Sequence, residues 1–197
     1  MAGGAGLERL WSPWRMAYVR RAAEPSGCLF CRTRRDRDDR RPLVIHRGPL
    51  AFVMLNRFPY NPGHLMVACA RHAASLADLT PEEREALVEA AVLAERALAA
   101  EYRPDGVNLG ANLGRVAGAG FPGHFHLHVV PRWNGDTNFM AVIAGTRVLP
   151  ESLARTWSRL RRAIARLAPR AAGPRGRARA ARRAARPAGG RARGRRG

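Results

Sequence analysis

The amino-acid sequence predicts an α+β fold in which an antiparallel β-sheet packs with a long central helix and a C-terminal helix. Short apolar runs separated by Gly and Pro recur between residues 43 and 69, and a capped helical pattern follows them. A stretch that alternates histidines with apolar residues comes later, at 124–130. Runs of this length with turn residues between them are typical of antiparallel strands, around which helices are segregated.

The strands are predicted from short runs of apolar and β-branched residues that turn residues bound. Gly48 and Pro49 separate the first two runs, and Pro131 is expected to end the last. In chain order the expected strands are 43–46, 50–55, 64–69, 107–109 and 124–130.

Two helices are predicted from capping residues and from apolar periodicity. Thr80 can cap a helix, Pro81 suits its first position, and Glu83 completes a capping box. An apolar stripe then runs toward residue 102. A second amphipathic helix is expected over 151–167, where large apolar residues recur at helical spacing.

Composition divides the chain of 197 residues into three parts. We expect an N-terminal arm rich in Trp and Tyr at 1–27, a folded domain at 28–168 and a disordered tail at 169–197. The tail contains only Arg, Ala, Gly and Pro, which cannot bury a core. The formal net charge is +20, and such a basic chain suits anionic substrates or polyanions.

Three cysteines are too few for a disulfide framework, and two of them form a Cys-x-x-Cys motif in a turn-prone setting after Pro25, Ser26 and Gly27. No apolar run approaches the ~20 residues that span a bilayer. The N-terminus also lacks the pattern of a secretory signal. The sequence therefore predicts a cytoplasmic protein without a membrane partner.

Half of the six histidines fall on the strand at 124–130. Because successive strand residues point to opposite faces, His124, His126 and His128 share one face, whereas Phe125, Leu127 and Val129 point to the core. The row of imidazoles indicates a site rather than three unrelated surface or core histidines. A catalytic row and a three-histidine zinc site both fit this pattern.

The segment His124-Phe-His126-Leu-His128-Val-Val resembles the H-φ-H-φ-H-φ-φ motif of the histidine triad (HIT) family of nucleotide hydrolases and transferases. Segment 56–67 is similar to the nucleotide-binding strand and loop of that family, and Asn112-Leu113-Gly114 falls at the expected place before the triad. Segments 10–16 and 131–139 resemble the bacterial branch that contains diadenosine tetraphosphate phosphorylases. The resemblance implies a HIT-type fold over roughly residues 7–167.

The resemblance implies that His126 is a nucleophile, which forms a nucleotidyl-histidine intermediate while a backbone carbonyl holds its other ring nitrogen. His128 and His64 are expected to contact phosphate oxygens. The remaining nucleotide-binding residues are expected to be Asn56 at the ribose, and Asn112, Gly114, Gly120 and Gly123 around the phosphates. Many family members carry a glutamine where this chain has Gly120, which leaves room for an acceptor other than water.

The resemblance also implies a structural Zn²⁺ held by Cys28, Cys31, His72 and His124, because two thiolates and two imidazoles make a closed tetrahedral set. Such a site disfavours the three-histidine alternative, since it already uses His124. Mg²⁺ bound with a polyphosphate and a homodimer are further expectations from the family.

The function expected from this resemblance is cleavage of a dinucleoside polyphosphate, with diadenosine tetraphosphate as the first candidate. Phosphorolysis is favoured over hydrolysis, and a purine nucleoside phosphoramidase uses the same machinery. The alternative of another class is a zinc-containing nucleic-acid-binding protein, in which the tail at 169–197 binds polyanions without base preference.

Overall fold

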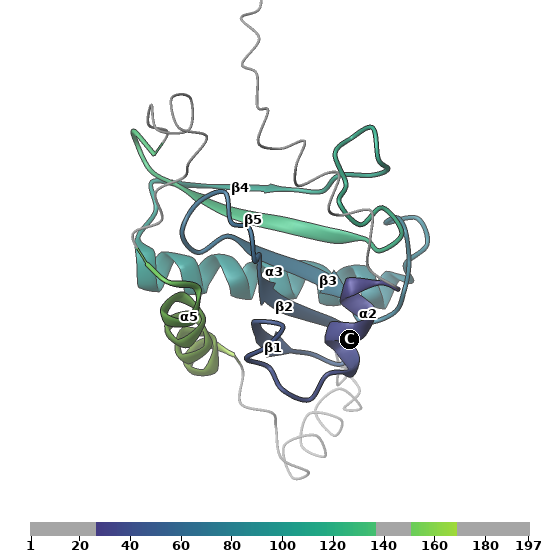
Figure 1. Ribbon diagram of the computed structural model, residues 1–197, viewed down its shortest axis with the longest axis horizontal. Helices are drawn as coiled ribbons and strands as arrows, with labels where there is room; N and C mark the ends of the chain where they lie inside the picture. The colour runs from purple at the N-terminus through teal and green to yellow at the C-terminus, as the bar shows by residue number, and fades with distance from the viewer. Residues whose placement is uncertain (1–26, 137–150, 169–197) are drawn as a thin grey trace, which may run out of the picture. The chain divides into compact units, whose positions relative to one another are not determined.

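The computed structural model describes residues 27–136 and 151–168. The predicted tail and, except for Gly27, the predicted aromatic arm lie outside these residues, so the predicted domain boundaries stay predictions. The described residues contain a five-stranded antiparallel sheet with the strand order β1-β2-β3-β5-β4 (Figure 1). Its strands are β1 (Val44–Arg47), β2 (Ala51–Leu55), β3 (Leu65–Cys69), β4 (Gly106–Gly110) and β5 (His126–Arg132). The predicted α+β fold is confirmed.

The centre of the sheet is made by β2 and β3, whose residues are all buried. Strands that are buried on both faces read as continuous apolar runs, and this explains why these two segments lack alternation. The strand β5 pairs with β3 on one side, where Met66 lies opposite His128 and Ala68 lies opposite His126. The histidine strand is therefore anchored to the most buried part of the sheet.

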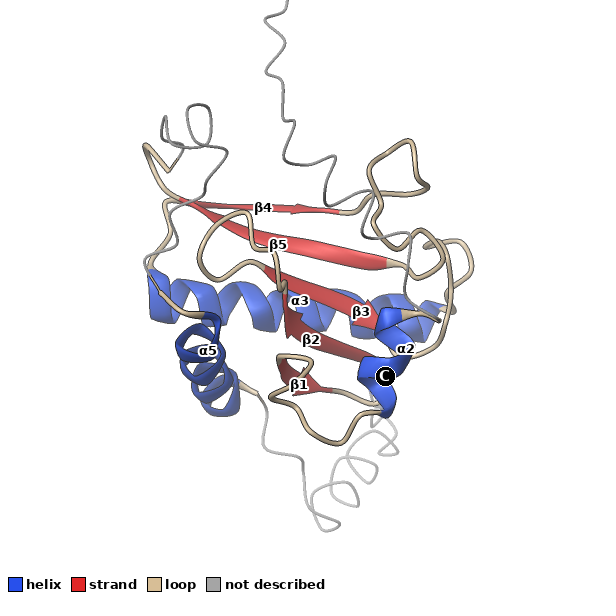
Figure 2. Cartoon of the chain, viewed as in Figure 1, coloured by secondary structure: helices blue, strands red, loops and turns tan. Residues whose placement is uncertain are grey.

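The long helix α3 (Pro81–Tyr102) lies behind the sheet, whereas the short helix α2 (Leu29–Arg35) lies in front of one end of it (Figure 2). The predicted capping box begins α3: Glu83 N–H donates to the Thr80 hydroxyl at 3.3 Å, and the Thr80 N–H donates to the Glu83 carboxylate at 2.9 Å. One apolar face of the sheet thus rests on α3, and the opposite face carries α2 and the histidines.

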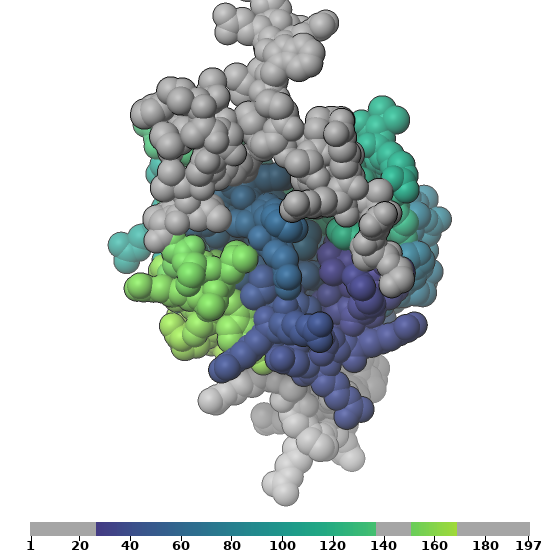
Figure 3. Space-filling view, viewed as in Figure 1, coloured from purple at the N-terminus to yellow at the C-terminus, as the bar shows by residue number. Residues whose placement is uncertain are grey.

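The C-terminal helix α5 (Leu153–Leu167) packs on α3 and β1. Leu160 and Ile164 are fully buried, and the Trp157 indole N–H donates to the Val44 carbonyl at 2.7 Å. Arg161 reaches Asp39 at 2.7 Å, so α5 lies beside the segment that leads into β1 (Figure 3). Within the described residues, no helix is both long and apolar enough to cross a membrane.

Two expectations about the histidine strand were wrong: β5 begins at His126, so His124 precedes it, and the strand does not end at Pro131. Pro131 does not end the histidine strand, because β5 continues to Arg132 and Pro131 pairs with Val107 of β4. On the other side of Pro131, the last pair with β3 is Leu65 with Val129, and the Asn61 side chain donates to the Pro131 carbonyl at 2.9 Å. A proline is tolerated here because no neighbouring strand requires its missing N–H.

Candidate active site and metal centre

The centre of the candidate site is His126, which is only 5% exposed. Its Nδ1 lies 2.9 Å from the backbone carbonyl oxygen of His124. A carbonyl can only accept a hydrogen bond, so Nδ1 carries the proton and Nε2 of the neutral ring keeps its lone pair. Burial lowers the pKa of His126, although the bond to the carbonyl opposes this effect. A neutral imidazole with a bare Nε2 is the form that can attack phosphorus.

His64 and His128 form a second pair beside His126. The Tyr60 backbone N–H donates to Nδ1 of His64 at 3.1 Å, and Nε2 of His64 lies 2.9 Å from Nδ1 of His128. Because the amide can only donate, His64 must carry its proton on Nε2 and donate it to His128. His128 then carries its own proton on Nε2. This series of hydrogen bonds makes His128 a neutral donor beside His126. The centroids of the two rings are 5.0 Å apart.

Asn56 follows β2 and is nearly buried against His64. Its side-chain amide lies 3.5 Å from both ring nitrogens of His64, and its Oδ1 accepts the Phe58 backbone N–H at 2.9 Å. The Asn56 N–H also donates to the His64 carbonyl at 2.9 Å. The structure therefore brings four predicted site residues together: Asn56, His64, His126 and His128.

The loop between β2 and β3 is held to the end of β5 by polar contacts. Asn61 donates to the Asp136 carboxylate at 2.8 Å, and the same carboxylate accepts hydrogen bonds from Arg132 and from the Trp133 backbone N–H. The Arg132 guanidinium in particular holds the pKa of Asp136 well below its usual range. These contacts at the Asp136 carboxylate hold the loop that carries Asn56 and His64 in a fixed position relative to the histidine strand.

The predicted phosphate loop leaves β4 at Gly110, directly opposite His128. Within it Asn112 is half-buried and donates to the Gly118 carbonyl at 3.3 Å. Gly114 adopts φ +80°, a left-handed conformation that favours glycine. Gly123 lies at the other end of the loop, beside His72. In the described residues no hydrogen bond joins Asn112 or these glycines to the imidazoles.

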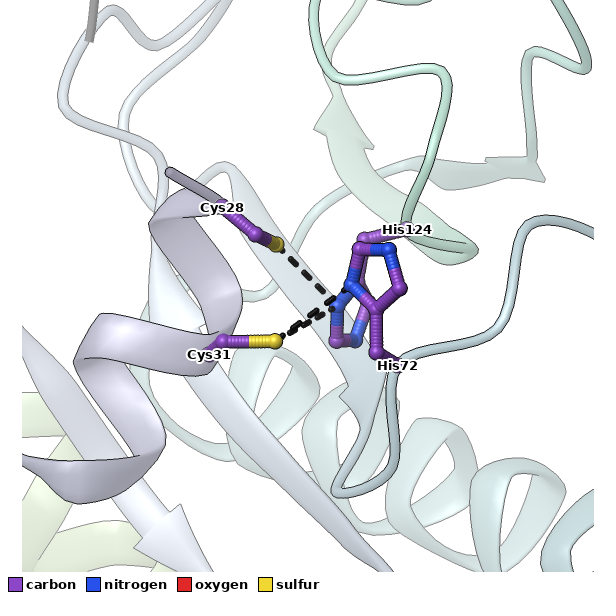
Figure 4. Close-up of side chains that lie close together, drawn as sticks. All are labelled: Cys28, Cys31, His72 and His124. Atoms are coloured by element: carbon purple, nitrogen blue, oxygen red, sulfur yellow. Dashed lines mark hydrogen bonds between the residues drawn. The ribbon is translucent and has the colours of Figure 1, made fainter. Parts of the chain in front are cut away.

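A second cluster of side chains lies at the start of the histidine strand, where Cys28 and Cys31 of the α2 region face His72 and His124 (Figure 4). One ligand atom from each residue lies within 4.8 Å of all the others. The Cys28 sulfur is 3.3 Å from Nδ1 of His124, and the Cys31 sulfur is 3.4 Å from Nδ1 of His72. Burial raises the pKa of Cys31, and the neighbouring Cys28 thiol raises it further.

The geometry of this cluster fits a tetrahedral metal ion. Typical Zn–S and Zn–N bond lengths place sulfur and nitrogen ligands ~3.5 Å apart, close to the distances in the cluster. Nε2 of His124 lies 3.0 Å from the Cys69 carbonyl oxygen, so the proton sits on Nε2 and Nδ1 keeps its lone pair. Metal-binding histidines ordinarily have a carbonyl or carboxylate partner of this kind. The four residues can therefore hold a metal ion.

His124 differs in role from the other two triad histidines. Its side chain belongs to the metal cluster, while its carbonyl orients His126. The Cys-x-x-Cys segment was expected in a turn, but Cys28 caps α2 and its carbonyl accepts the Arg32 N–H at 3.1 Å. A helical turn places two residues that are three apart on one face, and this brings both sulfurs to the cluster.

Sequence reasoning missed two contributors to the site. The Tyr60 backbone N–H sets the tautomer of His64, and no sequence signal distinguishes one amide of that loop from another. Phe30 packs its ring against His126, with 4.6 Å between the ring centroids. Its position between the two cysteines of the Cys-x-x-Cys motif was a signal that could have drawn attention to it.

Comparisons with known proteins agree with this geometry. A family model described as HIT domain matches residues 39–135. The AP-4-A phosphorylase of Mycobacterium tuberculosis is 41% identical to this chain over 154 residues, which make up 75% of this chain and 79% of that protein. The bis(5'-adenosyl)-triphosphatase of Saccharomyces cerevisiae is 29% identical over 91 residues, or 46% of this chain and 44% of that protein.

Among solved structures, a Zn-bound histidine triad family protein from Mycobacterium smegmatis superposes with a TM-score of 0.58 and 28% identity. The match covers 72% of this chain and 95% of that protein. The fold is thus shared with a histidine triad family protein, and the sequence is similar to those of two proteins named as enzymes that act on dinucleotides. The chain belongs to the histidine triad (HIT) family.

Proposed function

We propose that this protein cleaves a dinucleoside polyphosphate by transferring a nucleotidyl group to His126. The observation that carries this proposal is the bond between Nδ1 of His126 and the His124 carbonyl, since it leaves Nε2 as the nucleophilic nitrogen. A covalent intermediate divides one difficult displacement into two easier ones.

In the first step, Nε2 of His126 forms a bond to the α-phosphorus of the substrate. The bond between that phosphorus and the bridging oxygen breaks, and the remainder of the substrate leaves with the electron pair. His128, with its proton on Nε2, supports the charge that develops on the phosphate oxygens or on the leaving oxygen. In the second step an acceptor attacks the same phosphorus and releases His126.

Diadenosine tetraphosphate is the proposed substrate because a relative with 41% identity is named AP-4-A phosphorylase. Inorganic phosphate is the proposed acceptor, which gives ADP and ATP as products. Gly120 supports this choice, since it offers no side chain to orient a water molecule. Hydrolysis to AMP and ATP follows if water is the acceptor instead. A purine nucleoside phosphoramidate would be cleaved by the same two steps.

We further propose that the metal cluster of Cys28, Cys31, His72 and His124 holds Zn²⁺. The donor set of two sulfurs and two nitrogens supports this choice, as does the similarity to a Zn-bound protein of the family from Mycobacterium smegmatis. With four protein ligands, the ion would supply structural stability rather than a reaction step. The association of Mg²⁺ with the polyphosphate stays a prediction.

A homodimer, a cytoplasmic location and nonspecific association of the tail with nucleic acid also stay predictions. The cytoplasmic location is consistent with a cysteine pair that must remain reduced in order to bind metal. Deletion of residues 169–197 distinguishes the proposed enzyme from the alternative, a nucleic-acid-binding protein. Unchanged turnover after the deletion supports an enzyme, whereas a binder that acts through its tail would lose its affinity for polyanions.

Product analysis tests the proposed reaction directly. The purified protein is incubated with diadenosine tetraphosphate, with and without inorganic phosphate, and the nucleotides are separated. ADP and ATP that appear only with phosphate support phosphorolysis, and AMP and ATP without phosphate support hydrolysis. Turnover no higher than that of His126→Ala would overturn the proposal and direct attention to phosphoramidates.

A further inference from the structure

The helix α2 connects the metal cluster to the nucleophile. It has only seven residues, which is too short for a helix to be stable by itself. Its N-terminal end contributes Cys28 and Cys31 to the cluster. At its C-terminal end, the Arg47 guanidinium donates to the Thr33 and Arg34 carbonyls at 3.0 and 3.2 Å. The position of α2 therefore depends on what holds its two ends.

Phe30 is the residue of α2 that directly precedes Cys31, and its fully buried side chain packs between the helix and the sheet. Its ring centroid is 4.6 Å from that of His126 and 5.0 Å from that of His124, at interplanar angles of 36° and 38°. Phe52 and Phe121 contact the same ring from other sides, at 6.5 and 5.9 Å. One aromatic side chain thus contacts both a proposed metal ligand and the proposed nucleophile.

The orientation of the His126 imidazole needs such a contact. Rotation about the bond between Cβ and the ring has broad, roughly two-fold preferences, so the rotamer alone does not fix which nitrogen faces the carbonyl. The hydrogen bond to the His124 carbonyl restrains one edge of the ring. The Phe30 ring lies against its face and obstructs rotation out of this position, because close-packed interiors leave little room for such movement.

We propose that Phe30 is a positioning residue, which holds the His126 imidazole against the His124 carbonyl and links this position to the metal cluster through α2. The proposal rests on the proposed function of His126 as the nucleophile. Metal binding at Cys28 and Cys31 fixes α2, and α2 fixes Phe30. The bare Nε2 of His126 is thereby kept in the direction from which it attacks.

The first test compares Phe30→Leu with Phe52→Leu. Both phenylalanines are fully buried in one hydrophobic cluster, but within the described residues the ring contacts of Phe52 include Phe30 and not His126. We expect Phe30→Leu to lower kcat by at least about tenfold with little change in KM, since small misplacements of a reacting group cost that much or more. Phe52→Leu should lower thermal stability to a similar degree and leave kcat within about twofold. Both variants should retain stoichiometric zinc.

A second readout does not depend on turnover. Long-range ¹H–¹⁵N spectra of the imidazoles report which nitrogen carries the proton. The wild type and Phe52→Leu should show His126 protonated on Nδ1, whereas Phe30→Leu should show a mixture of tautomers. If Phe30→Leu does not fold, Phe30→Met takes its place, because methionine fills irregular apolar space.

The link to the metal cluster is tested by a double-mutant cycle with Cys31→Ser. Cys31→Ser should lose zinc and lower kcat by at least about tenfold, yet it should add little to the loss already caused by Phe30→Leu. The proposal would be overturned if zinc-loaded Phe30→Leu had the wild-type kcat and the wild-type His126 spectrum. It would also be overturned if the losses of kcat in Phe30→Leu and Cys31→Ser were fully additive in the double mutant. Failure of the proposed function is distinct, because the wild type itself would then show no turnover.

Discussion

The backbone carbonyl of His124 accepts the Nδ1–H of His126 at 2.9 Å, while the side chain of His124 faces Cys28 and Cys31. His124 thus belongs to the metal cluster through its side chain and orients the proposed nucleophile through its carbonyl. Stability of the cluster and orientation of the nucleophile are therefore expected to change together. Under the proposed function, only His126 and His128 of the three triad histidines are then left to contact the substrate.

Replacement of His64 tests the hydrogen-bond chain from Tyr60 to His128. His64→Ala removes the donor to Nδ1 of His128, so His128 no longer has a fixed tautomer. We expect kcat to fall about a hundredfold, comparable to the loss of one oriented donor at an anion. Steady-state kinetics measures this effect. His46→Ala is the matched control, since His46 lies on β1, which is separated from the histidine strand by β2 and β3; equal losses in both variants would contradict the assignment.

Metal removal should destabilise the protein and inactivate it together. A ligand that binds only the folded state stabilises it by about 4 kcal/mol at a free concentration about 1,000-fold above its Kd. Cys28→Ser should therefore lose bound zinc and show a lower unfolding temperature in calorimetry. Cys69→Ala is the control, because its carbonyl still supports His124 after the thiol is removed. Wild-type stability in metal-free Cys28→Ser would disprove a structural role.

The predictions from sequence succeeded where one short motif contained its own geometry. The capping box of Thr80 and Glu83 required no distant partner, and neither did the alternation of His126 and His128 on β5. His124, in contrast, lies before that strand, and its side chain faces the cysteines. The course of β5 through Pro131 was not predictable, because it depends on pairing with Val107 of β4. The same reason applies to Tyr60, whose amide matters only once the loop places it beside His64.

Gly63 precedes His64 and tests how strictly the loop conformation is required. Its φ is +83°, and an added Cβ would lie 2.9 Å from Cδ2 of Leu98. Gly63→Ala should cost at least about 1–2 kcal/mol from the left-handed backbone alone. Gly106→Ala is the control, since nothing lies within 4 Å of its Cβ position and its φ is not positive. Chemical denaturation measures both, and equal stabilities would refute the steric argument.

Acid should weaken the link between Arg71 and the start of α3. The Arg71 guanidinium, together with the Thr80 N–H, lowers the pKa of Glu83 to about 2 from a usual 4.5. A carboxylate with a depressed pKa stabilises the fold fully above pH 4.5 and loses this contribution as the pH falls toward 2. The difference in unfolding temperature between the wild type and Glu83→Gln should shrink over this window. A difference that stays constant from pH 6 to about 2.5 would contradict this mechanism.

The proposed role of His126 as the nucleophile is tested most directly by trapping the intermediate. Diadenosine tetraphosphate labelled at the α-phosphorus is mixed with excess protein, and the mixture is quenched in alkaline denaturant because phosphoramidate bonds are labile in acid. Proteolysis should then place the label on the peptide that contains His126, and His126→Ala should retain none. Label on another residue, or single turnover by the wild type with no labelled protein at any time, would contradict the mechanism.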